Sequence, residues 1–197
     1  MVENSVLIAE PNFMTNMTIE DLQKKDQDFN ISGFIAKVDN IFIMLHSAVM
    51  LGNLERVKHK LNENLIKRYQ SIIDNLNSQN IRQMYDEINV KSTEILSINE
   101  TEDKYVIQVL LISRYIDYLM HKETRKLASG NNSSRVEKRN YLTLTKIKNY
   151  KNEASARKCP GCGANINTNF SGKCPYCGTT YDTANYDWIL EDIEVDS

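Results

Sequence analysis

The sequence predicts an α+β fold, in which N-terminal helices pack on a curved antiparallel sheet, followed by a small cysteine-rich module. Apolar residues recur at three- and four-residue steps as far as Leu76, as in amphipathic helices, and at two-residue steps after Tyr85, as in strands. All four cysteines of the 197-residue chain lie between positions 159 and 177. Helices that precede a run of strands favour a layered fold, in which the sheet curls over the helices and encloses a small cavity.

Three helices are expected in the first half of the chain, after an arm over residues 1–28 that includes a short helix at 18–25. Apolar residues at helical spacing predict a first long helix from Ser32 that Gly52 ends. A second helix is expected over LERVKHKL, residues 54–61, and a third begins after Asn62 or Asn64. The core face of the first long helix carries Phe34, Val38, Ile41, Phe42, Leu45 and Val49.

Strands are expected from about residue 88 onwards. Alternating apolar residues over 88–98 precede a turn at 99–103, and the apolar run YVIQVLLISRYIDYLM predicts a central strand over 104–120. The polar stretch over 123–134 contains SGNNSS and is expected to be a long loop. The segment 135–148 then supplies a final strand, YLTLTKIK.

The cysteines form two matching Cys-Pro-x-Cys-Gly motifs, Cys159 with Cys162 and Cys174 with Cys177. The two-residue gap lets both sulfurs of a pair face one ion, and the eleven residues between the pairs are long enough for a hairpin arm. Two disulfides or a redox pair are alternatives, but nothing else indicates an oxidising compartment, and a redox pair does not explain the duplication. We therefore predict one structural Zn²⁺ bound by all four thiolates.

Composition narrows the function classes. The formal net charge is −2, which argues against a general nucleic-acid binder with a basic surface. We find no run of eighteen apolar residues and no secretion signal, so the expected compartment is the cytoplasm. No residue pattern identifies catalytic groups or a binding site for an organic cofactor.

Several segments together resemble the bacterial Tim44-like domain proteins, named after a subunit of the mitochondrial inner-membrane import machinery, in the variant that ends in a zinc ribbon. The resemblance spans roughly Phe29 to Ile193. It implies a cone-shaped domain similar to nuclear-transport-factor-two-like folds over residues 29–152, a zinc ribbon with an acidic tail over 153–197, and a non-catalytic binding role. The mitochondrial relatives attach peripherally to membranes and to translocation partners. The segments are FIAKVDNIFIMLHSAV, NLERVKHKLNENLIKRYQ, VLLISRYIDYLM, YLTLTKIK, CPGCGA, SGKCPYCGT and YDWILEDI.

The preferred function is a non-enzymatic adaptor that binds a protein partner, with at most weak peripheral contact with the inner face of the membrane. One alternative is a nucleic-acid-binding zinc ribbon, although the arm ANINTNFSGK has a single basic residue and a single aromatic one. Another is an isomerase-like cone-fold enzyme or small-molecule binder, with His121 near Tyr115, Asp117 and Tyr118 at a cavity mouth. His46 and His59 lack partners at metal spacing, so ordinary core or surface roles are expected for them.

Charged residues flank the cysteine module on both sides, and we interpret them as two solvated faces that partly neutralise each other. A docking surface for an acidic partner is the functional alternative. We expect Trp188, the only tryptophan, to pack back on the ribbon or on the first domain. The basic residues are Arg135, Lys138, Arg139, Lys146, Lys148, Lys151, Arg157 and Lys158, and the acidic ones are Asp182, Asp187, Glu191, Asp192, Glu194 and Asp196.

Overall fold

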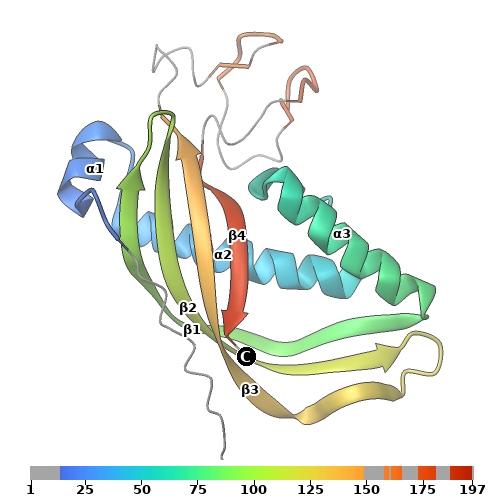
Figure 1. Cartoon of the computed structure of the whole chain (residues 1–197). Coiled ribbons are helices and arrows are strands. Elements are labelled where there is room, and N and C mark those ends of the chain that lie inside the picture. Colours follow the sequence, from blue (N-terminus) through green and yellow to red (C-terminus); the bar gives the residue numbers. More distant parts are fainter. Residues whose placement is uncertain (1–13, 149–157, 160, 166–172, 181–186, 197) are drawn as a thin grey trace, which may run out of the picture.

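The computed structural model describes residues 14–148, 158–159, 161–165, 173–180 and 187–196. Within these residues, an antiparallel sheet has the strand order β1-β2-β3-β4, and three α-helices accompany it (Figure 1). The fold is therefore α+β, as the sequence predicts. The helices are α1 (Ile19–Lys25), α2 (Ile31–Leu51) and α3 (Glu63–Ser78), and the strands are β1 (Ile81–Glu100), β2 (Lys104–His121), β3 (Leu127–Ile147) and β4 (Ile189–Asp196).

Local sequence signals set the helix ends. The Asn30 side chain accepts a hydrogen bond from Gly33 N–H at the start of α2, and Gly52 ends the helix in the left-handed region at φ 67°. Asn62 caps α3 in the same way through Leu65 N–H. Thr18 and Asp21 form a reciprocal capping box at the start of α1. The helices expected at 18–25, from Ser32 and from Asn62 are thus confirmed.

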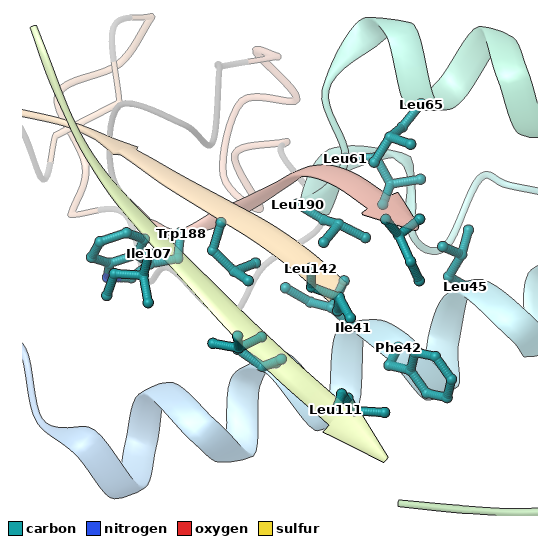
Figure 2. Close-up of a cluster of buried hydrophobic side chains, with 14 of the residues drawn as sticks. Ile41, Phe42, Leu45, Leu61, Leu65, Ile107, Leu111, Leu142, Trp188 and Leu190 are labelled. Atoms are coloured by element: carbon teal, nitrogen blue, oxygen red, sulfur yellow. The ribbon is translucent and has the colours of Figure 1, made fainter. Parts of the chain in front are cut away.

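The core lies between α2 and one face of the sheet (Figure 2). Burial along β2 alternates strictly from Tyr105 to Tyr115, so its odd-numbered residues face the core. The strand lies between β1 and β3, which confirms the expected central position. Ile41 and Phe42 of α2 pack there with Leu111 of β2. Full burial of each such aliphatic or aromatic side chain stabilises the fold by about 1.5 to 3 kcal/mol.

By length and composition alone, α2 could cross a membrane, but 44% of its apolar window is buried within the protein. Most of its buried residues belong to the same cluster as those of the sheet, and Ile35, Ile43 and Met44 pack against that cluster. The hydrophobicity of α2 is therefore accounted for by the core, because the helix must cover a sheet face along most of its length.

Three sequence-based expectations about the chain between the helices and strands are wrong. LERVKHKL forms turns and only a three-residue 3₁₀ helix, η1 (Lys58–Lys60). The expected loop at 123–134 is mostly strand, because β3 begins at Leu127 and its first residues pair with the far end of β2. The segment at 141–148 is not the final strand, since β4 follows the cysteine module and pairs antiparallel with β3.

Candidate metal centre

The first knuckle, described over residues 158–159 and 161–165, is a tight backbone turn around Cys159. The N–H of Cys159 donates to Ala164 O at 2.7 Å, and Gly163 N–H donates back to Cys159 O at 2.8 Å. Lys158 and Asn165 form an antiparallel bridge that closes the turn. Gly163 has φ 72°, which a residue with a side chain rarely adopts. The glycine of the motif is therefore required by the turn itself.

The second knuckle, residues 173–180, repeats this arrangement. Cys174 N–H donates to Thr179 O at 2.9 Å, and Gly178 N–H donates to Cys174 O at 2.9 Å. Lys173 and Thr180 form the closing bridge, and Gly178 has φ 73°. The duplication in the sequence is thus a duplication of backbone geometry.

The two knuckles bring their four sulfurs together. All four Sγ atoms lie within 4.8 Å of one another. Across the knuckles, Cys159 Sγ is 3.5 Å from Cys177 Sγ, and Cys162 Sγ is 3.7 Å from Cys174 Sγ. Four sulfurs at about 2.3 Å from one tetrahedral ion would be about 3.8 Å apart. Disulfide sulfurs would be about 2.05 Å apart, and these cysteines are free. The cluster therefore fits a single metal ion.

The pKa is lowered at two of the sulfurs, Cys159 and Cys177, which favours their thiolates. At Cys162 the backbone N–H of Ala164 lowers the pKa, but Cys177, burial and the other sulfurs outweigh it and raise that pKa to about 12. Gly161 N–H points at Cys159 Sγ at 3.3 Å. The Thr179 hydroxyl lies 3.1 Å from Cys177 Sγ and, by donating to it, lowers the pKa of that thiol to about 6. Since the thiolate is the form that binds metal, the protein prepares this sulfur for coordination near neutral pH.

Thr179 also packs the second knuckle against the first. A Cβ built on Gly161 would overlap Thr179 Oγ1 and would lie 3.0 Å from the Thr179 Cβ. Gly161 therefore leaves the space that the threonine side chain occupies. This contact and the sulfur–sulfur approaches both join the knuckles.

The segment that follows the second knuckle is anchored by a buried ion-pair cluster. Asp187 is 4% exposed and accepts from the ammonium groups of Lys37 on α2 and Lys60 on η1, the latter at 2.9 Å. Burial alone would raise the pKa of this carboxyl, but Lys60 and Lys37 together hold it below its ordinary value. Asp187 therefore ties the chain after the knuckles to two earlier elements.

Trp188 completes this anchor, as the sequence predicts. Its ring is 4% exposed and meets Phe34 edge-on, with centroids 5.2 Å apart, and Phe29 at 6.0 Å. Leu190, two residues later, is fully buried, and its carbonyl accepts a hydrogen bond from Asn62 N–H at 3.0 Å. The side chains of Trp188 and Leu190 are thus part of the main core (Figure 2).

The structure does not assemble the proposed histidine cluster. His121 is exposed at the end of β2, whereas Tyr115 is buried six residues earlier, about 20 Å away along the strand. His46 is buried beside Phe42, with ring centroids 4.0 Å apart, and burial lowers its pKa to about 4. It therefore has a core role, as expected.

Among the described flanking charges, one pair joins the basic set to the acidic set, and other members of the basic set pair with carboxylates elsewhere in the fold. Arg139 pairs with Asp196, and Lys146 and Lys148 pair with Asp26 and Glu100. Lys151, Arg157 and Asp182 lie outside the described residues. Sequence reasoning missed the Asp187 cluster, because no spacing rule connects residues 37, 60 and 187.

Comparison with known proteins adds a family. The model of the Tim44-like domain family matches residues 15–156. Among curated proteins, none matches. Among solved structures, the intermembrane space region of the chloroplast protein ARC6 is similar at 9% identity and a TM-score of 0.37, over 82% of this chain and 95% of that chain.

Proposed function

The chain belongs to the Tim44-like domain family, and on that premise we propose that it is a non-enzymatic adaptor that holds one structural zinc ion and binds a protein partner. The proposal places it in the cytoplasm, where any contact with the inner face of a membrane is made through that partner. The four-cysteine cluster and the anchored chain that follows it support this function.

Zinc is the proposed ion because the donor set is four soft sulfurs that all lie within 4.8 Å of one another. With Cys159, Cys162, Cys174 and Cys177 as ligands, the four coordination positions of zinc are filled. No position remains for a water molecule or a substrate, which is the arrangement of structural zinc sites. The ion would close the two knuckles against each other.

The single observation that carries the adaptor role is the anchor at Asp187 and Trp188. It fixes the chain after the second knuckle to α2, η1 and β3. A module followed within seven residues by chain that is fixed to a packed core is suited to presenting a surface beside that core, whereas a module on a long free tether is not.

A small-molecule enzyme is less well supported. The cleft between the ends of α2 and α3 and the start of β1 has a volume of about 70 Å³. Sites for small molecules and cofactors usually measure about 300 to 1,000 Å³. This cleft suits a side chain better than a substrate.

The test is capture of the partner by the zinc-loaded, tagged chain in its native cells after brief cross-linking. We expect at least one protein in near-stoichiometric amount over a tag-only control, with less captured by Trp188→Ala, in which the anchor is lost. The reduced, zinc-loaded chain enriching nothing over the tag-only control would contradict the adaptor role.

A further inference from the structure

One end of the molecule gathers four elements into a platform. There α2 and α3 end, β1 begins, and β2 turns into β3, at the right-hand end of the sheet in Figure 1. Lys122 N–H donates to Asn80 O at 3.0 Å, which joins the β2–β3 turn to the start of β1. Within the turn, His121 N–H donates to Lys126 O at 2.9 Å, and Arg125 N–H donates to His121 O at 3.0 Å.

This platform carries a group of unpaired cations, which we call the cationic end: Arg82, Lys122, Arg125 and Lys126. Arg82, Arg125 and Lys126 are exposed, and Lys122 is half-buried with its ammonium on Asn77 Oδ1. Within the part of the chain that the structure describes, none of the four forms an ion pair. The turn from 121 to 127 contains one acidic residue, Glu123.

Most other basic side chains behave differently. The majority of the described lysines and arginines outside the cationic end lie within 4.0 Å of a carboxylate, so their charges are compensated inside the protein. The chain as a whole has a formal charge of −2. The cationic end thus gathers four uncompensated basic residues in a chain whose described basic residues are mostly compensated. The compensated residues are Lys24, Lys25, Lys37, Lys58, Lys60, Lys67, Arg68, Lys91, Arg114, Arg135, Arg139, Lys146 and Lys148.

A small cleft with both apolar and polar lining groups opens beside Arg82 and Lys122. Val49, Ile73, Leu76 and Ile81 line it together with Arg82 and Lys122, and its volume is about 70 Å³. Leu51, also on its lining, is 67% exposed. A cleft of this kind accepts one apolar side chain and places the neighbouring groups of the ligand against positive charge.

We propose that the cationic end binds an acidic segment of a protein partner, which inserts one apolar side chain into the cleft and sets carboxylates against Arg82 and Lys122. Further carboxylates along the segment face Arg125 and Lys126. The proposal deepens the adaptor function, on which it rests, by naming the class of partner and the surface that receives it.

A polypeptide fits this surface better than a nucleic acid or a bilayer. Residues 79–83 and 119–127 contain no Phe, Tyr or Trp on which bases could stack. A bilayer offers no projecting side chain for a cleft. An acidic peptide satisfies both features, since its carboxylates match the cations and an apolar residue matches the cleft. At about 0.15 M salt, charges are screened within about 8 Å, so only an acidic segment seated in the cleft gains from several cations at once.

The probe is a labelled peptide of Asp and Glu residues interrupted by Leu, and binding to the full zinc-loaded chain is measured by fluorescence anisotropy. The peptide should bind to the unmodified chain, and this binding should weaken as the salt concentration rises. Its affinity for the Arg82→Glu, Lys122→Glu variant should be at least about tenfold lower. The matched control is Lys24→Glu, Lys67→Glu, which changes the net charge equally at side chains that are 77% and 76% exposed. It should lose less than about half of the affinity, because its charges lie away from the cleft.

Further variants and ligands separate the alternatives. Leu51→Ser should lower the affinity for the peptide severalfold without changing the salt dependence of binding. Replacing Leu by Ser in the peptide should have the same effect on affinity and salt dependence. Equal losses in both charge-reversal variants, or no binding by the peptide, overturn the proposal. The proposal is also overturned if the chain binds anionic vesicles or single-stranded DNA but not the peptide, and if the Arg82→Glu, Lys122→Glu variant loses that binding. Partner capture from cells that survives Arg82→Glu, Lys122→Glu would leave the adaptor role intact and remove only this surface.

Discussion

Trp188 is the residue whose removal tests most directly how the chain after the knuckles is held. The indole is 4% exposed and packs edge-on against Phe34 and near Phe29 at the start of α2. Trp188→Ala would leave a cavity between α2 and β4, with the neighbouring rings only partly able to fill it.

The expected cost follows from the size of the buried ring. A buried Trp→Ala change costs about 3 to 5 kcal/mol through lost transfer energy and the cavity left behind. Trp188→Phe keeps much of the apolar volume, so about 1 to 2 kcal/mol is expected for it. Because β4 begins at the next residue, hydrogen exchange should also accelerate from Ile189 onwards.

The assay is urea unfolding followed by far-ultraviolet circular dichroism, which does not depend on the lost fluorophore. Tyr176→Ala is the control, since that side chain is 76% exposed and should change stability by no more than about 0.5 kcal/mol. A loss below about 1 kcal/mol for Trp188→Ala, or one equal to that of Tyr176→Ala, would refute the anchor.

The metal centre and the buried titratable groups lead to four further predictions. One zinc per chain should be found by metal analysis, and Cys174→Ser should abolish it while leaving the circular dichroism of the sheet largely unchanged. Gly161→Ala should weaken zinc binding, measured by competition with a chelator, because the new methyl group meets Thr179, and the double variant with Thr179→Ala should recover part of it. Asp187→Asn should lower the free energy of unfolding by about 3 to 5 kcal/mol at neutral pH, because it leaves two lysines uncompensated. Since the pKa of Asp187 is lowered in the folded protein, the stability that this carboxylate contributes should be lost as pH falls below about 4. His46 has a folded pKa of about 4, so stability should fall as pH drops from about 6.5 to 4, and His46→Phe should flatten that part of the profile in acid titrations.

The parts of the fold that sequence reasoning predicted are those with strong local signals. The period of α2 and its ending at Gly52 depend on residues near one another in the chain, as does the cap of α3 at Asn62. The duplicated cysteine motif is equally local, and the structure brings its sulfurs together. Zinc itself stays a prediction, as does the division of the chain at residues 28 and 152.

The parts that it missed depend on pairing between distant segments. SGNNSS has the composition of a loop, yet Gly130 and Ser129 pair with Tyr118 and Leu119 because β2 is long enough to template them. Gly130 has φ 86°, and a Cβ there would lie 2.9 Å from Asp117 O. The strand therefore contains an irregular position, Gly130, at which only glycine fits without strain. The prediction for LERVKHKL was wrong in the opposite sense, because a segment with helical propensity forms turns that bury Leu54 and Val57.

The basic residues before the cysteine module show why charge in a sequence cannot be equated with charge available to a partner. The Lys146 side chain is 14% exposed and bonded to Asp26, which is itself 10% exposed. Lys148 shares Glu100 with Lys25 at the turn between β1 and β2. Separating such lysines from their carboxylates would leave buried or half-buried charges uncompensated. Attraction to an anionic bilayer contributes about 1 kcal/mol per basic residue, which is too little to break these pairs. Cations become available to a partner only where the fold supplies no carboxylate, and among the described residues that condition is met most densely at Arg82, Lys122, Arg125 and Lys126, at the end of the sheet where β2 turns into β3.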